Sequence, residues 1–213
     1  RTWNSNIYEK KYVRLSETIV RKTTLSKPAF SSFSATLSGK NCACTASRAA
    51  LAELAPKWGR RDLAVVISDG LSATAAKAHA ADTAIALFKF LPKANWSAYP
   101  VFIVPYARVK IQDDINETLG ARHTIILVGE RPGLGSPDSL SAYFTYRSKW
   151  ESVESDRNCI SNIRPSGMPI ELAARKLSML MEEPRVCGIS GTALKDDIDM
   201  SALESASNAA LSG

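Results

Sequence analysis

The sequence predicts an α/β fold in which helices flank a mostly parallel β-sheet. Three short apolar runs have the length and continuity of strands buried on both faces: Leu63–Ile67, Pro100–Val104 and Thr124–Val128. Segments with helical spacing separate these runs. The order strand, helix, strand, helix, strand is typical of α/β proteins, because a helix is the usual connection between parallel strands.

Two segments between the predicted strands have the features of helices. Ser72–Leu91 carries Ala, Ile, Leu and Phe at helical spacing, and the proline that follows cannot continue a helix. Asp113–Leu119 predicts a shorter helix that ends at Gly120, since glycine readily adopts the left-handed conformation of a helix C-cap. Asp113 and Asp114 are adjacent and would point to different sides of this helix. We therefore expect them to stabilise its N-terminus rather than to form a catalytic pair.

Outside this strand–helix series, the sequence predicts two further helices and one loop. Pro169–Glu183 gathers its Leu, Ala and Met residues on one face, as in an amphipathic helix. Asp156–Pro165 is polar and predicts an ordered loop that the side chains of Ile160 and Ile163 pin to the core. Ala46–Trp58 has an apolar stripe of Ala and Leu and predicts a helix before the first strand.

The composition excludes several classes of protein. Of the 213 residues, 45% are hydrophobic and 23% are charged, as in ordinary globular domains and unlike collagenous, coiled-coil or wholly disordered chains. No apolar run approaches the roughly 20 residues that cross a bilayer, and no signal-peptide core follows Arg1. We therefore expect a soluble protein without a membrane span.

The net charge of +6 is unevenly distributed along the chain. Residues 1–61 contain 12 Lys or Arg and 3 Glu, a balance of +9, whereas residues 62–213 have a balance of −3. This division predicts a basic, Ser/Thr-rich N-terminal extension over 1–61 and a folded domain over 62–213. The extension is either a targeting or docking segment or a poorly ordered leader. Because the basic residues are not spread over the folded domain, we expect no nucleic-acid partner.

The sequence contains no pattern of a self-sufficient catalytic or metal centre. The four cysteines lack the paired spacing of a zinc ribbon, and His79 and His123 have no motif-linked partner. No G-x-S-x-G nucleophile elbow is present. Without a secretory signal, the cysteines are expected to be reduced. We therefore expect neither a catalytic residue nor a protein-supplied metal ligand.

Ligands of α/β sheets bind beyond the carboxyl ends of the strands, and three segments of this chain fall there. They follow the three predicted strands in turn: Ser68–Ser72, Pro105–Lys110 and Gly129–Ser136. The glycines of the last segment are spaced G-x-x-x-G-x-G, which is neither the dinucleotide pattern nor the P-loop pattern. This segment is either a structural turn or a loop that lies against a polar ligand. The charged candidates at this edge are Asp69, Arg108, Lys110 and Glu130.

Five strings of residues occur in an order that resembles one protein family. They are VISDGLS at 66–72, RVKI at 108–111, LGA at 119–121, GERPGLGS at 129–136 and DRNCISNI at 156–163. Together they resemble the small (light) subunit of ethanolamine ammonia-lyase, an adenosylcobalamin-dependent carbon–nitrogen lyase of ethanolamine breakdown. Any one string is weak evidence, whereas the ordered set is specific and covers about residues 62–189.

The resemblance implies a Rossmann-like domain and a division of labour between two subunits. The large subunit, a TIM barrel, would bind ethanolamine and carry out its radical conversion to acetaldehyde and ammonia. The small subunit would close over the lower face of the cobalamin. The resemblance also implies a hetero-oligomer, located in a bacterial microcompartment or in the cytoplasm.

The family's cofactor-contacting positions fall on three residues of this chain: Val109 in RVKI, Glu130 in GERPG and Cys159 in CISNI. The resemblance implies that these residues bind adenosylcobalamin. Glu130 would accept hydrogen bonds from corrin amides or a ribose hydroxyl, while Val109 and Cys159 would offer apolar contact and backbone groups. Neither histidine lies in a D-x-H-x-x-G string, so we expect the cobalt to keep its own dimethylbenzimidazole as lower ligand. The chain departs from the family at Ala107, where the family usually has glycine.

Two other functions stay open on the sequence alone. A non-catalytic ligand-binding module would retain the fold while its divergent extension lost the partner subunit. A stand-alone nucleotide enzyme would use the glycine-rich loop at 129–136, and binding of ATP or NAD by the isolated chain would support it. The ordered set of strings favours the lyase subunit over both.

Overall fold

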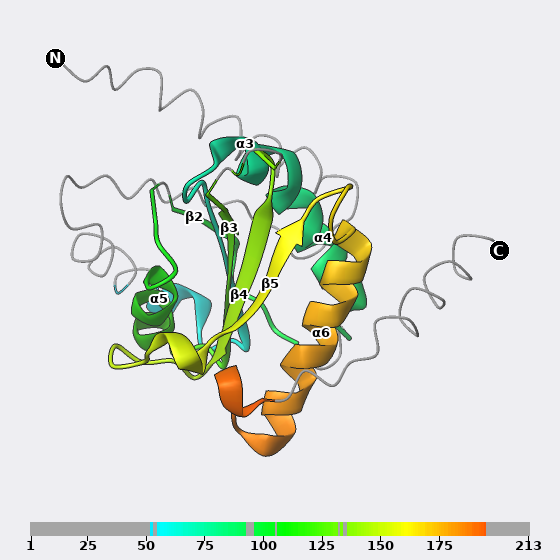
Figure 1. The fold of residues 1–213 in the computed structure, drawn as a ribbon. Helices are drawn as coiled ribbons and strands as arrows, with labels where there is room; N and C mark the ends of the chain where they lie inside the picture. Colours follow the sequence, from blue (N-terminus) through cyan, green and yellow to red (C-terminus); the bar gives the residue numbers. More distant parts are fainter. Residues whose placement is uncertain are drawn as a thin grey trace, which may run out of the picture.

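A computed structural model describes residues 52, 55–92, 96–104, 106–131, 133 and 136–194 (Figure 1). Its strands are β1 (Leu63–Ser68), β2 (Phe102–Ile103), β3 (His123–Gly129), β4 (Leu140–Tyr146) and β5 (Asn158–Ile163). Its helices are α3 (Ala73–Ala75), the π-helical turn η1 (Ala76–Ala80), α4 (Ala81–Phe90), α5 (Ile111–Leu119), the 3-10 turn η2 (Glu154–Asp156), α6 (Ile170–Cys187) and the 3-10 turn η3 (Gly191–Ala193). Most of the predicted extension 1–61, and with it most of the predicted helix Ala46–Trp58, lies outside the described residues.

The strands form one mixed sheet in the order β2-β1-β3-β4-β5. β1 pairs in parallel with β2 and β3, whereas β4 pairs antiparallel with both β3 and β5. The three strands predicted from the sequence are therefore present and mutually parallel. The prediction of a mostly parallel sheet is too simple, because the second half of the sheet is the antiparallel series β3-β4-β5.

β4 is a strand that the sequence analysis missed although its signal was present. Leu140, Ala142 and Phe144 are buried in the core beneath the helices α4 and α6, and the residues between them face the opposite side of the sheet. This is the period-two alternation of a strand with two different faces. β4 is not a continuous apolar run, because polar residues such as Ser141 and Thr145 interrupt it on the other face.

β5 corrects the prediction of a loop at Asp156–Pro165. Ile160 and Ile163 do pin this stretch to the core, since both are buried. The pairing of β5 with β4 is irregular, however, and Asn162 has a left-handed φ of 58°. Because of this irregularity, Ile160 and Ile163 pack into the same core although they are three residues apart. The strand therefore lacks the regular alternation of apolar and polar residues by which strands are predicted from a sequence.

Helices cover both faces of the sheet (Figure 1). α4 and α6 pack side by side on one face, and α5 lies on the other. The side chains of β1 alternate between these layers: Leu63, Val65 and Ile67 join the α4–α6 core, and Ala64 and Val66 join the α5 core. Burial on both faces explains why this strand is a continuous apolar run.

The three predicted helices that fall within the described residues are confirmed, with changes at their ends. Ser72 caps the first helical segment, since its Oγ accepts a hydrogen bond from the amide of Ala75 at 3.2 Å. Gly120 ends α5 in the left-handed conformation, with a φ of 65°. α6 continues through Pro184 to Cys187, about one turn beyond its predicted end. Among the described residues, no helix is both long and apolar enough to span a membrane.

Candidate functional site

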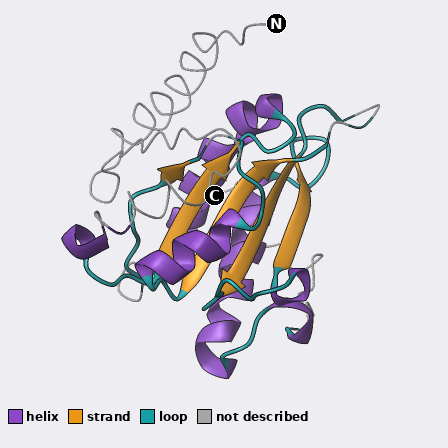
Figure 2. Cartoon of the chain, turned by 90° about the vertical axis from the view of Figure 1, so that its left-hand side faces the viewer, coloured by secondary structure: helices purple, strands orange, loops and turns teal. Residues whose placement is uncertain are grey.

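Within the described part of the chain, the face of the sheet that carries α5 is covered unevenly. α5 packs against β3 and β1, and Figure 2, which looks onto this face, shows the strands on the right standing clear of the helix in front. Tyr143 of β4 and Cys159 of β5 are register partners; Tyr143 is half-buried and Cys159 is exposed. We call the surface formed by Glu130, Tyr143 and Cys159 the open face. It adjoins the carboxyl end of β3, one of the edges where the sequence predicts ligand binding.

Glu130 connects the strands that border the open face. It follows β3 directly, and its carboxylate accepts hydrogen bonds from the hydroxyls of Ser139 and Ser141. It also accepts a hydrogen bond from the backbone N–H of Asn162 at 3.2 Å. Ser141 belongs to β4 and Asn162 to β5. Because a carboxylate has about four acceptor positions, these three bonds leave about one position for a ligand.

The surroundings of Glu130 keep its carboxylate ionised. Burial opposes ionisation, but the hydrogen bonds from the two serines and the Asn162 amide outweigh it, and the positive charge of Arg164 acts in the same direction. The pKa of Glu130 therefore lies below its ordinary value. At neutral pH the open face holds a fixed negative charge at this residue.

The lowered pKa of Glu130 makes stability depend on pH. Its ionised form stabilises the fold fully above the unfolded-state pKa of about 4.3, and this contribution is lost as the pH falls through the lower folded-state pKa. We expect the native protein to have a larger free energy of unfolding than the Glu130→Gln variant. This difference should be constant between about pH 6 and 8 and much smaller near about pH 3. Urea denaturation at each pH measures this difference. A difference that is as large in acid as at neutral pH would contradict the assignment.

Tyr143 and Cys159 both stay protonated at neutral pH. Burial is the main cause that raises the pKa of Tyr143 to about 12, and its neighbour Cys159 adds to the effect. Desolvation also raises the pKa of the Cys159 thiol, although the thiol hydrogen bonds with Tyr143 and Ser141. A protonated thiol is a poor nucleophile. The pair therefore presents neutral aromatic and sulfur atoms beside the Glu130 carboxylate.

Val109 lies in the loop between β2 and α5, half-buried against the same apolar cluster as Tyr143. This loop is fixed to the end of β1, because the N–H of Ala107 donates to Ser68 Oγ at 3.0 Å. The Ser68 hydroxyl in turn donates to the carbonyl of Ala107 at 3.3 Å. Ala107 is buried and does not have a left-handed φ, so the backbone at this position does not require glycine.

Asp69 lies at the carboxyl end of β1, as predicted, and anchors the same loop. Its buried carboxylate accepts a hydrogen bond from the backbone N–H of Tyr106 at 2.7 Å. Tyr106 has a left-handed φ of 58°, so the chain turns sharply there. Of the basic residues predicted at this edge, Arg108 is exposed and Lys110 reaches the loop that follows β4.

The segment that directly follows the glycine-rich loop 129–136 is held by residues that precede α4, whereas three residues of the loop itself lie outside the described part of the chain. The hydroxyl of Ser72 donates to the carbonyl of Pro137 at 2.7 Å. His79 Nε2 lies 3.3 Å from Asp138 Oδ2. Both predicted roles of the loop stay predictions: these contacts fasten the chain just after the loop, and the Glu130 carboxylate offers a hydrogen-bond acceptor at its start.

The histidines lie away from the open face. His79 pairs with Asp138. His123 packs between the rings of Trp96 and Tyr146, at centroid distances of 4.8 Å and 4.9 Å. Its register partner Leu63 belongs to the α4–α6 core, so His123 is on that side of the sheet. Within the ranges that the structure describes, no three His, Cys, Asp or Glu side chains gather as metal ligands.

Sequence reasoning missed the residues that support the predicted site: Ser139, Ser141, Tyr143 and Asn162. The alternating pattern of β4 could have indicated that Ser141 and Tyr143 share a face. The pattern does not indicate that this face would lie beside Glu130. That depends on the antiparallel pairing of β4 with β3 and β5.

The comparisons with known proteins agree on one family. The family model described as ethanolamine ammonia-lyase light chain (EutC) matches residues 39–195, beginning within the predicted extension. An ethanolamine ammonia-lyase small subunit from Azotobacter vinelandii is 47% identical over 148 residues, covering 70% of this chain and 55% of that protein. One from Pseudomonas syringae pv. tomato is 46% identical over 147 residues, covering 69% and 51%. The chain thus spans about half the length of these curated relatives. The extent of the match and the identity over it show that the chain belongs to the ethanolamine ammonia-lyase light-chain family.

Proposed function

We propose that this chain is the small subunit of an adenosylcobalamin-dependent ethanolamine ammonia-lyase and that Val109, Glu130 and Cys159 contact the cobalamin. Family membership supports the activity. The observation that carries the binding proposal is the meeting of Glu130 and Cys159 at one surface. Glu130 and Cys159 come from different elements and meet at the open face, and Val109 packs on the apolar cluster that supports Tyr143.

The chemistry of the open face fits a cobalamin. The corrin carries amide side chains whose N–H groups are donors, and Glu130 has an acceptor position left for such a donor. The neutral surfaces of Tyr143, Cys159 and Val109 suit the hydrocarbon periphery of the ring, because apolar contact there removes area from water. Both histidines of the chain lie away from this face. Neither histidine would therefore ligate the cobalt of a cofactor bound at this face.

The residues of this chain would bind and orient rather than react. When bound, adenosylcobalamin supplies the radical chemistry that converts ethanolamine to acetaldehyde and ammonia. Glu130 would fix the rotation of the ring by accepting a hydrogen bond at a defined place. Tyr143 and Cys159, both protonated, would exclude water from the site. We propose that the large subunit holds the substrate and completes the site, in a bacterial microcompartment or the cytoplasm.

Co-expression with an ethanolamine ammonia-lyase large subunit tests this function. The complex is purified through a tag on this chain and titrated with adenosylcobalamin, while corrin absorption and acetaldehyde release are followed. A copurifying pair that binds the cofactor and releases acetaldehyde is the expected result. A folded chain that copurifies with no large subunit and leaves the corrin spectrum unchanged would overturn the proposal and favour a non-catalytic binding module.

A further inference from the structure

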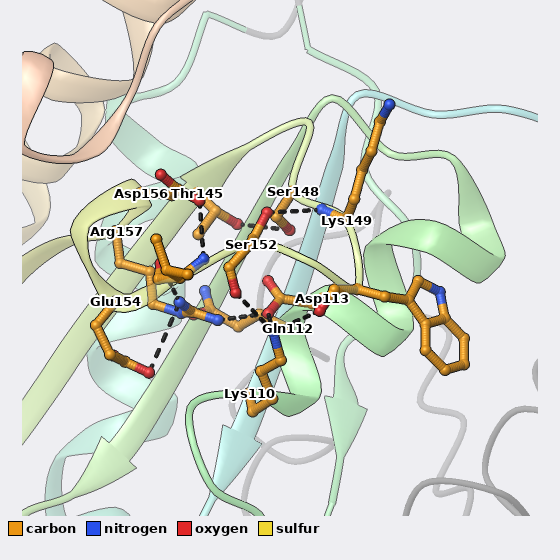
Figure 3. A network of polar contacts seen from close by, with 12 residues as sticks. Lys110, Gln112, Asp113, Thr145, Ser148, Lys149, Ser152, Glu154, Asp156 and Arg157 are labelled. Atoms are coloured by element: carbon orange, nitrogen blue, oxygen red, sulfur yellow. Dashed lines mark hydrogen bonds and ion pairs between the residues drawn. The ribbon is translucent and has the colours of Figure 1, made fainter.

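A buried carboxylate joins the segments that carry Val109 and Cys159 (Figure 3). Asp113 lies in the first turn of α5, and its side chain is fully buried. Lys110 Nζ lies 2.9 Å from Asp113 Oδ2, and the Arg157 guanidinium donates through Nη2 to the same oxygen. Lys110 adjoins Val109 in the sequence, and Arg157 is two residues before Cys159. One carboxylate therefore connects the α5 loop to the beginning of β5.

The two cations also hold the loop that runs from β4 to β5. Lys110 Nζ donates to the carbonyls of Trp150 at 2.7 Å and Ser152 at 2.6 Å. Arg157 Nη1 donates to the carbonyl of Val153 at 2.6 Å. This loop leads directly into the strand that bears the exposed thiol of the open face. Its path is thus set by side chains whose common partner is Asp113.

The contacts around Asp113 depend on its charge. The side chains of Asp113 and Arg157 are 0% and 1% exposed, so each ion has lost most of its hydration. The opposite charge of its partner offsets this loss. Burial raises the pKa of Asp113, while Lys110 and Arg157 favour its ionised form. Glu154 also approaches Arg157, at 3.7 Å, but is 78% exposed and therefore screened by solvent. Asp113 is the buried anion that compensates both cations.

We propose that Asp113 is a positioning residue that sets the separation of Val109 and Cys159 and thereby pre-organises the cobalamin site. It touches no ligand atom and acts through Lys110 and Arg157. The proposal rests on the proposed function. Pre-organisation of this kind raises affinity because the binding residues need not be ordered when the ligand arrives.

The first test is the Asp113→Asn variant in the complex with the large subunit. We expect the Kd for adenosylcobalamin to rise about tenfold, because displaced contacts lose much of their binding energy. The rate at saturating cofactor should change by less than about twofold, since the residue touches no reacting atom. The matched control is Asp62→Asn. Asp62 also ties segments together, just before β1, accepting from the Ser97 amide at 3.0 Å and pairing with Arg122 at 3.2 Å.

Two readouts separate positioning from mere stability. In a double-mutant cycle, Asp113→Asn should raise Kd less in a Cys159→Ala background than alone, because its effect passes through that contact. Amide hydrogen exchange without cofactor should quicken at both 106–110 and 157–160 in Asp113→Asn and at neither segment in Asp62→Asn. If Asp113→Asn does not fold, Lys110→Met takes its place, since it removes the ammonium group and keeps most of the stem.

The outcomes distinguish this inference from the proposed function. A native complex that binds no adenosylcobalamin overturns the proposed function and, with it, the positioning role. If the native complex binds the cofactor and Asp113→Asn retains its Kd while losing thermal stability, Asp113 is structural only and the inference fails. Additive effects with Cys159→Ala, or faster exchange in only one of the two segments, would also overturn it.

Discussion

Glu130→Gln should weaken adenosylcobalamin binding by about tenfold, because a hydrogen bond to a charged group contributes roughly 1.5–3 kcal/mol. The substitution keeps the shape of the side chain but removes its charge and replaces one acceptor oxygen with an amide donor. The hydroxyls of Ser139 and Ser141 can rotate to accept from that amide, and the remaining oxygen can still accept from Asn162. The fold should therefore persist while the acceptor offered to the cofactor is lost. Titration of the complex, followed by corrin absorption, measures the change in Kd.

The control for this experiment is Glu171→Gln on α6. Glu171 pairs with Lys89 at 3.7 Å, and both side chains are exposed on the opposite face of the sheet. Removing such a pair changes stability by less than about 1 kcal/mol and should leave cobalamin binding unchanged. If Glu130→Gln bound the cofactor as tightly as this control, Glu130 would be only a support for the strands and the binding role would be wrong.

Gly129→Ala should destabilise the protein by about 3 kcal/mol or more, at the upper end of the cost of overpacking. A Cβ at this position would lie 2.0 Å from the carbonyl oxygen of Ser72 and 2.7 Å from that of Asp69. Both neighbours are backbone atoms, so neither can move aside without disturbing the turn that follows β1. Urea denaturation should show a lower midpoint. Because Gly129 directly precedes Glu130, cobalamin affinity should fall as well.

Gly133→Ala provides the matched control within the same loop. A Cβ there would meet no atom within 4 Å, so we expect a change within about 0.5 kcal/mol in the free energy of unfolding. Equal stability of the two variants would show that the end of β3 is not packed against the turn after β1 in solution. It would thereby undermine the position given to Glu130.

Local patterns were sufficient to predict the parallel half of the fold. β1 and β3 are buried on both faces, so their residues are apolar at successive positions rather than at alternate ones. The end of a helix could be predicted where a single residue caps it, as Gly120 does at the end of α5. The candidate residues Val109, Glu130 and Cys159 came from the ordered strings and not from any local pattern.

The antiparallel half of the sheet and the contacts of the site residues could not be predicted from local sequence patterns. β5 escaped recognition because its bulge places Ile160 and Ile163 in one core at a spacing that fits no regular strand. The partners of Glu130 and Asp113 lie on other elements, and a hydrogen bond between distant residues leaves no periodic trace in either segment. Asp113 looked like a helix-capping charge, yet burial opposite Arg157 made it a connection between two segments. Residue type and spacing therefore specify which surfaces are apolar, whereas strand register determines which polar groups meet, because register is set by the packing of the whole sheet.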